Sequence, residues 1–278
     1  MKAEWEPGDE KKIFKELKKE FESTFEELIP GVLHNFANPL SGILGRSELL
    51  EEKAKKNFEL ITNNDYKTDD EILKGCKKII CDAGLIVREA EMLLGLFNDV
   101  AGKFQRLNDT GLQRINLSEL VEAEITFFQF YHDFKHNIKK RLTLDREIPE
   151  VSGTKADYSN SLSAIIRHSM NSMKDSELKE LVISTAYDNS HVCVKIKDTG
   201  APIVEREKTL KNLSSTGHFL HDLNGEKGLF YALSLLKKYG ALFQIAYESG
   251  FNVISIRIPY QESEVRDCDC SRSQDEAV

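Results

Sequence analysis

The chain lacks the features that mark a membrane-spanning, secreted or nucleic-acid-binding protein. No stretch approaches the roughly 18 consecutive apolar residues of a membrane span. Residues 1–12 do not have the basic-then-apolar layout of a signal peptide. The net charge is −8 and no basic stripe offsets it, which argues against a nucleic-acid partner. We therefore expect a cytoplasmic protein without membrane or nucleic-acid partners.

Cysteine is scarce, and its spacing matches no metal site. The count is odd, and the positions are Cys76, Cys81, Cys193, Cys268 and Cys270. Reduced thiols in the cytoplasm are the simplest interpretation of such a set. The last two cysteines lie in a polar tail, residues 263–278, which lacks hydrophobic periodicity and is expected to be disordered. We expect no metal site.

Apolar residues recur at steps of three and four through residues 13–107, after an extension of residues 1–12. This spacing is typical of two long amphipathic helices. The first stripe comprises Phe14, Leu17, Phe21, Phe25, Leu28, Val32 and Phe36. The second comprises Ile72, Cys76, Ile79, Ala83, Ile86, Ala90, Leu93, Phe97 and Val100.

Local signals predict where these two helices break. Pro30-Gly31 interrupts the first stripe, so we expect a kink or a restart of the helix there. A polar gap separates the two stripes and ends in Thr68-Asp69-Asp70-Glu71, which has the pattern of a capping box. The two helices should therefore form a hairpin.

A single hairpin of this length has no means of burying both apolar stripes by itself. We therefore expect two copies of the chain to pair as a homodimer with a four-helix bundle. The alternative is a monomer in which both stripes pack on the C-terminal half. The sequence alone does not decide between the homodimer and the monomer.

Beyond residue 108 the pattern changes to alternating, β-rich runs with helical stretches between them. The helical stretches are Ser159–Lys174 and Gly228–Tyr239. The β-rich runs are RLTLD (141–145), ELVISTAYD (180–188), HVCVKIKD (191–198), ALFQIAYE (241–248) and NVISIRIP (252–259). Interspersed strands and helices favour an α/β sandwich with helices on one face of a sheet. The boundary falls near residues 107–114, so residues 115–262 should form the second domain of an α+β protein.

His34 lies within the first helical pattern but out of phase with its apolar stripe. It follows Val32 by two residues and precedes Phe36 by two. At about 100° per residue, two steps turn the side chain roughly 200° away from the stripe. We expect the imidazole to face solvent.

The surrounding residues, LHNFANPLSG (33–42), resemble the phospho-accepting motif of two-component histidine kinases. His34, Asn38, Pro39 and Leu40 all match in register. Later segments resemble the nucleotide-binding boxes of the same family in order and spacing: SLSAIIRHSMNSM (161–173), VKIKDTGAPI (194–203) and NGEKGLFYALSLLKKYGA (224–241). The resemblance covers about Ile13–Tyr260. It implies a dimerisation and histidine-phosphotransfer hairpin, residues 13–107, followed by a kinase-type ATPase domain.

The resemblance implies a chemical role for His34. In this family the exposed histidine takes a phosphoryl group on nitrogen and passes it to an aspartate of a response-regulator receiver domain. A neutral imidazole suits this task near neutral pH. The family has an acidic residue directly after the histidine as a proton acceptor, but here Asn35 replaces it, and an amide is not a base at this pH. Asn38, one turn on, matches the residue that positions water for dephosphorylation.

The nucleotide site departs from the family pattern at its magnesium end. His168 stands where the family has the asparagine that coordinates Mg²⁺, and imidazole is a poor ligand for this hard ion. Asn171, one turn later, is a partial substitute. Asp198 and Gly200 match the residues that recognise the adenine amino group and let the backbone approach.

The phosphate-binding loops depart from the pattern as well. Pro202 replaces a glycine of the first box. Gly228 and Leu229 are kept in the second box, while Glu226 and Lys227 replace the upstream glycine and leucine. Residues 212–218 resemble the family's lid without its phenylalanines. Bound ATP and Mg²⁺ are therefore not expected as firm cofactors.

Three functions follow as rivals. The leading one is a phosphorelay protein, similar to histidine phosphotransferases built on a kinase core, in which His34 exchanges phosphate with receiver domains. Its autokinase activity would be weak or lost, so a separate sensor kinase could supply the phosphate. The second is an active ATP-dependent protein-histidine kinase. The third is a pseudokinase that only binds a receiver or another kinase.

Overall fold

The structure is a computed structural model. It describes residues 9–62, 69–203 and 227–260, and it describes only the backbone of residues 9–14, 16–27, 69–71 and 227. Several sequence expectations lie outside the described residues, namely those for the extension 1–8, Thr68, the lid-like segment 212–218, Glu226, the side chain of Lys227 and the tail 263–278 with Cys268 and Cys270.

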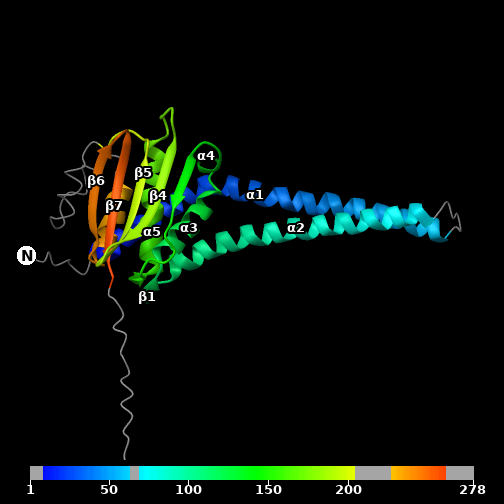
Figure 1. The fold of residues 1–278 in the computed structure, drawn as a ribbon, viewed down its shortest axis with the longest axis horizontal. Coiled ribbons are helices and arrows are strands. Elements are labelled where there is room, and N and C mark those ends of the chain that lie inside the picture. The colour runs from blue at the N-terminus through cyan, green and yellow to red at the C-terminus, as the bar shows by residue number, and fades with distance from the viewer. Residues whose placement is uncertain (1–8, 63–68, 204–226, 261–278) are drawn as a thin grey trace, which may run out of the picture.

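The N-terminal half is a helical hairpin, as the sequence predicts. Helix α1 (Asp9–Thr62) and helix α2 (Asp69–Asn108) run side by side, and the hairpin projects far beyond the rest of the molecule (Figure 1). Among the described residues, no helix is long and apolar enough to span a membrane. The cysteines with described surroundings, Cys76, Cys81 and Cys193, are unbridged.

Helix α1 is continuous through both of its prolines. Pro30 and Pro39 lie inside the helix, so the prediction of a restart at Pro30-Gly31 is wrong. Each proline removes one backbone hydrogen bond. The helix persists because it is packed on both sides of Pro30, where Leu28 is fully buried and Val32 packs on the core.

The C-terminal half is built on a five-stranded sheet, which confirms the predicted α+β class. The strand order is β2-β4-β5-β7-β6; β2 pairs parallel with β4, and the other neighbours are antiparallel. The strands are β2 (Lys139–Thr143), β4 (Glu180–Tyr187), β5 (His191–Asp198), β6 (Leu242–Glu248) and β7 (Phe251–Pro259). Strand β5 alternates between buried and half-buried residues along its whole length, because one face lies on the core.

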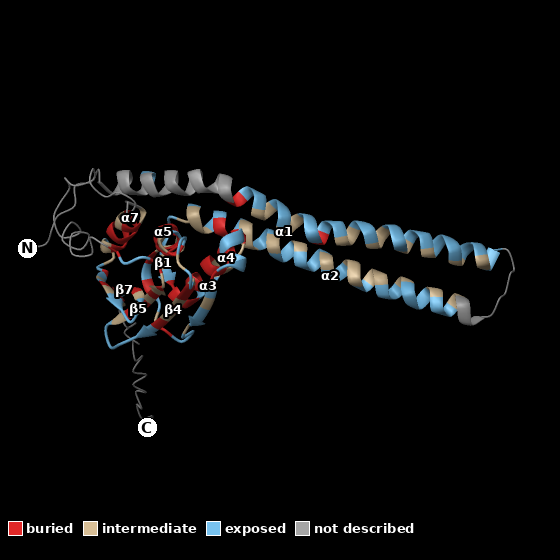
Figure 2. Cartoon of the chain, turned by 90° about the horizontal axis from the view of Figure 1, so that it is seen from above, coloured by how far each residue is buried: buried red, intermediate tan, exposed pale blue. Residues whose placement is uncertain are grey.

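Helices cover one face of the sheet (Figure 2). They are α3 (Leu117–Phe128), α5 (Lys155–Ser172) and α7 (Lys227–Lys237). Asn116 caps α3 by accepting from the backbone N–H groups of Ser118 and Glu119, and Thr154 caps α5 through the N–H of Asp157. The sequence pattern did not reveal α3. It also missed three short elements: α4 (His132–His136) and the antiparallel pair β1 (Leu112–Ile115) and β3 (Val151–Thr154).

Part of the first apolar stripe packs on the C-terminal half. Leu28 belongs to the core, and Val32 and Phe36 pack against it. On α2, Leu96 and Val100 do the same. Helix α1 also contacts α5 and α7. In the part of the hairpin nearest the sheet, the apolar stripes therefore pack on the C-terminal half, as the monomeric alternative expects.

The rest of the hairpin carries exposed apolar side chains. On α2 they recur at heptad spacing: Leu73, Ile80, Val87 and Leu94. On α1 they include Leu33, Leu40, Leu44, Leu49, Phe58 and Ile61. A heptad stripe outside the α1–α2 contact is the seam that a second helical pair would cover. The four-helix bundle of a homodimer thus stays a prediction, now with named positions.

A buried polar network joins the hairpin to the C-terminal half. Lys103 of α2 has no exposed surface, and its ammonium pairs with Glu124 of α3, which is equally buried. The ammonium also donates to the hydroxyls of Ser159 and Ser163 on α5, at 2.8 and 2.5 Å. Both hydroxyls donate onward to the Glu124 carboxylate, and Arg106 Nε donates to it at 3.2 Å.

This Lys103–Glu124 network fixes α2 against α3 and α5. Burial lowers the pKa of Lys103 to about 8, although the adjacent Glu124 carboxylate acts in the opposite direction. Separating the two halves of the molecule would break this ion pair. A buried pair of this kind is costly to break one partner at a time.

We predict that single and double substitutions of this pair differ sharply. Glu124→Leu leaves the Lys103 ammonium buried without a counterion. Lys103→Met leaves the Glu124 carboxylate buried without one. Each variant should lower the free energy of unfolding, measured in urea titrations, by about 3–5 kcal/mol. The double variant Lys103→Met/Glu124→Leu removes both charges and should recover at least half of that loss. Additive losses in the double variant would contradict a coupled pair.

Candidate phosphoryl-transfer site

His34 lies on α1 with its side chain exposed, as its helical phase predicts. Asn38, one turn further, is also exposed, whereas Pro39 is buried and Asn35 is half-buried. The histidine thus sits at the flank of the face that packs on the C-terminal half. An imidazole in this position is accessible to a partner protein without any movement of the chain.

The side chain of Asn35 contacts the C-terminal half of the chain. Lys135 of α4 donates a hydrogen bond from Nζ to Asn35 Oδ1 at 3.1 Å. The amide therefore serves as an acceptor for a lysine beside His34. No pattern in the sequence singles out Lys135, because the contact joins residues one hundred positions apart. Only the closing of the fold brings them together.

The approach of α4 to α1 depends on a glycine. A β-carbon built on Gly31 would lie 1.9 Å from the carbonyl oxygen of Phe130, well inside any real contact distance. The ring of Phe130 packs edge-on against that of Phe36, with centroids 6.4 Å apart. The turn before α4 is therefore pressed onto α1 about one helical turn before His34.

Helix α4 carries His132, Lys135 and His136. His132 and His136 face each other with ring centroids 4.8 Å apart. Partial desolvation and the charges of His132, Lys135, Lys140 and His34 all lower the pKa of His136. Two histidines four residues apart on a helix have the spacing of a pair of metal ligands. Among the described residues no group of three His, Cys, Asp or Glu side chains is arranged to hold a metal.

The adenine end of the predicted nucleotide site is partly built. Asp198 is completely buried, and its Oδ1 accepts from Ser172 Oγ, Gly200 N and Asn252 Nδ2 at 2.8 to 2.9 Å. Its Oδ2 is buried without a hydrogen-bond partner among the described residues. A buried carboxylate oxygen of this kind fits an amino-group donor such as that of adenine.

Gly200 and Asn252 shape this end of the site. A β-carbon at Gly200 would lie 2.1 Å from Ser172 Oγ, so only glycine fits there. Asn252, fully buried at the start of β7, donates to the carbonyl of Ala201 at 2.9 Å and accepts from the N–H of Ile203 at 3.1 Å. The sequence analysis missed Asn252. A buried asparagine amid the apolar residues of its strand was the available signal.

Among the described residues, the magnesium and phosphate end lacks the usual ligands of Mg²⁺–ATP. His168 and Asn171 both lie near the C-terminal end of α5; His168 is half-buried and Asn171 is exposed. The imidazole of His168 is not a magnesium ligand of the usual oxygen type. Pro202 is exposed and has no N–H to offer a phosphate. Gly228 is half-buried and Leu229 is part of the hydrophobic core.

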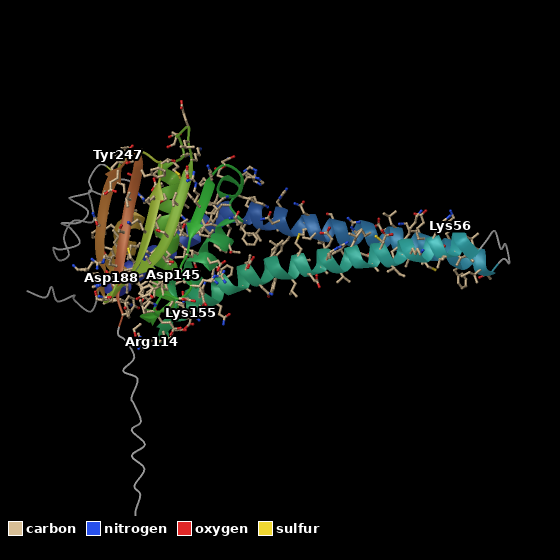
Figure 3. The ribbon with its side chains drawn as sticks, viewed as in Figure 1. Lys56, Arg114, Asp145, Lys155, Asp188 and Tyr247 are labelled. Atoms are coloured by element: carbon tan, nitrogen blue, oxygen red, sulfur yellow. The ribbon has the colours of Figure 1, made fainter. Side chains whose placement is uncertain are left out.

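Helix α5 is enclosed along most of its length. Every residue from Ala156 to Arg167 is buried, polar ones included. It packs against α2, α3 and α7, and α1 contacts both α5 and α7. Figure 3 shows the labelled Lys155 at the start of α5, near the end of the hairpin that meets the sheet, whereas Lys56 lies toward the opposite end. The helix that carries His34 therefore packs directly against the helices that carry His168 and Gly228.

Comparisons with known proteins were made against families, curated proteins and solved structures. No protein-family model matches the chain, and no curated protein does. The catalytic domain of the histidine kinase ThkA is similar over 54% of this chain and 97% of its own, with 18% identity and a TM-score of 0.46. The histidine kinase AdeS of Acinetobacter baumannii is similar over 82% and 98%, with 16% identity and a TM-score of 0.42.

A bacterial phosphotransferase is also similar, over 84% of this chain and 95% of its own, with 15% identity and a TM-score of 0.37. The fold itself, a helical hairpin followed by an α/β sandwich, is given by the described elements of this chain.

We predict that Gly31→Ala loosens α4 from α1. The new β-carbon collides with a backbone oxygen that has little freedom to move, and overpacking of this kind costs about 1–3 kcal/mol in urea unfolding. Gly45→Ala on the same helix is the matched control. Nothing lies within 4 Å of its β-carbon, so it should stabilise the protein by up to about 1 kcal/mol. Equal effects of both variants would contradict the close approach.

Proposed function

We propose that the protein is a two-component phosphorelay protein that passes a phosphoryl group through His34 to or from aspartates of response-regulator receiver domains. Autophosphorylation from ATP is weak or lost, and a separate sensor kinase supplies the phosphate through its receiver. The exchange takes place in the cytoplasm. The observation that carries the proposal is an exposed His34 whose neighbour Asn35 is a lysine-bound amide in place of a base.

The accessibility of His34 supports exchange with a partner. Phosphoryl transfer between a histidine and an aspartate breaks one N–P bond and forms one O–P bond, with no proton to remove from a neutral imidazole nitrogen. Such a histidine needs a solvent-facing ring and a docking partner, and it needs no general base beside it. Asn38 on the next turn is exposed on the same flank and is available to orient water for dephosphorylation.

The fixed position of the C-terminal half supports the loss of autokinase activity. Delivery of ATP to His34 requires a nucleotide domain that binds Mg²⁺–ATP and then moves to the histidine. Here the magnesium ligand is replaced by His168, and the Lys103–Glu124 network holds the domain on the hairpin. The domain is therefore better suited to act as a scaffold and a docking surface.

An active ATP-dependent kinase is the second candidate, favoured by one observation. The unpartnered Oδ2 of Asp198 is suited to an adenine amino group, so nucleotide binding is retained in this alternative. A pseudokinase that only sequesters a receiver is the outcome if His34 takes phosphate from neither source.

We predict that His34 is labelled by a phosphorylated receiver and not by ATP. Incubation with labelled ATP and Mg²⁺ should leave the chain unlabelled, whereas a labelled receiver should give acid-labile, base-stable phosphate on the chain. His34→Gln should abolish that label, and His191→Gln, which replaces a histidine on β5 far along the chain, should retain it. Label from ATP would instead favour the kinase, and label from neither source would favour the pseudokinase.

The proposal includes a homodimer, in which the exposed heptad stripe of α2 pairs with a second copy. We predict a two-chain mass for the protein by light scattering at micromolar concentration. Ile80→Lys and Val87→Lys should reduce it to one chain, because a lysine in the seam has no apolar partner. Lys77→Glu, a charge change at an exposed position of the same helix, should leave the dimer intact. A monomeric wild-type protein would contradict this part of the proposal.

A further inference from the structure

Three contacts hold the segment around α4 against α1 at the level of His34. The backbone of Phe130 abuts Gly31, the ring of Phe130 packs on Phe36, and Lys135 donates to Asn35. Gly31 precedes His34 by three residues, which turns its position only about 60° from that of the histidine on the helix. Helix α4 therefore stands beside the face that His34 occupies.

Basic side chains gather at α4. The helix carries His132, Lys135 and His136, and Lys140 lies just after it on strand β2. The one carboxylate on the same short helix, Asp133, is exposed, lies 3.9 Å from His132 Nδ1 and accepts from Asn137 Nδ2. His132, Lys135, Lys140 and His34 all lie close enough to His136 to lower its pKa. In a chain of net charge −8, this cluster is a local reversal.

Lys140 has a different role from Lys135. Its ammonium donates to the backbone carbonyls of Phe134 and Lys135, at 2.6 and 3.0 Å, and lies 5.1 Å from the centroid of the Phe134 ring. These contacts fix Lys140 to the end of α4. Lys135 is exposed and bonds a neutral amide, which is a weak partner for a full positive charge.

We propose that Lys135 binds the phosphoryl group while it is held on His34, exchanging its hydrogen bond to Asn35 for an ion pair with the phosphoryl oxygens. This inference rests on His34 being the phosphoryl acceptor. Asn35 directly follows His34 on α1, about 100° further around the helix. His136 of α4 interacts with both Lys135 and His34, so all three lie close together, and a change of rotamer moves the Lys135 ammonium from the amide to the histidine. A phosphoryl dianion outcompetes an amide for an ammonium.

Such a contact explains why an amide, which is not a base, follows His34. In the unphosphorylated protein the amide holds Lys135 beside the histidine. When a receiver aspartate gives up its phosphoryl group, the lysine neutralises part of the charge that arrives on His34. When the phosphoryl group leaves, with the N–P bond breaking and an O–P bond forming on the aspartate, the lysine returns to Asn35.

The test uses chemical phosphorylation, so that it needs no partner protein. Phosphoramidate transfers its phosphoryl group to exposed imidazoles, and the ³¹P resonance of phospho-His34 is identified by its absence in His34→Gln. A pH titration of that resonance in the full chain gives the second pKa of the phosphoryl group. A nearby ammonium favours the dianion and lowers this pKa.

Lys135→Gln should raise the phosphoryl pKa by roughly 0.2–0.7 units, the range that an exposed ion pair supplies. Lys139→Gln is the matched control, because it makes the same charge change at an exposed lysine on the neighbouring strand β2. It should leave the value unchanged. Asn35→Ala should lower the phosphoryl pKa or leave it as it is, because it removes only the competing acceptor.

An unchanged phosphoryl pKa in Lys135→Gln, or an equal rise in Lys139→Gln, would overturn the contact. Failure of a receiver to phosphorylate His34, with the Lys135 effect present, would instead contradict the proposed relay and leave this contact standing. The two proposals therefore fail in different experiments.

Discussion

The buried ion pair between Lys103 and Glu124 is the interaction on which the arrangement of this molecule depends. It joins the second helix of the hairpin to two helices of the α/β half, and the hydroxyls of Ser159 and Ser163 complete its hydrogen bonds. A charged pair without solvent contact is stable only while every partner stays in place. The two halves therefore form one packed unit, and that unit determines what stands beside His34.

What stands beside His34 is the short helix α4 with its lysines and histidines. In the two-domain arrangement that the sequence motifs imply, a mobile nucleotide domain would visit the histidine in turn. In this chain the C-terminal half is already in contact with the histidine-bearing helix, through Lys135 and the turn at Phe130. The domain that resembles an ATPase is thus a fixed neighbour of the helix that carries His34.

The periodicity of the sequence predicts the hairpin, the five strands of the main sheet and the exposure of His34, because each follows from local spacing of apolar residues. It does not reveal Lys103, Glu124 or Lys135, since their partners lie 18 to 100 residues away and polar residues carry no periodic signal. Gly31 was read as a helix breaker. Its purpose is the close approach of Phe130, which only the tertiary fold defines. The roles of Asn171, Gly228 and Leu229 stay predictions.

The central claim is that phosphate reaches His34 from a partner and independently of any nucleotide on this chain. The most direct measurement is the single-turnover rate of transfer from a phosphorylated receiver domain to the protein, in the presence of Mg²⁺, with and without saturating ATP. The account predicts transfer to His34 at the same rate in both conditions. Transfer that occurs only with ATP bound, or no transfer at all, would contradict it.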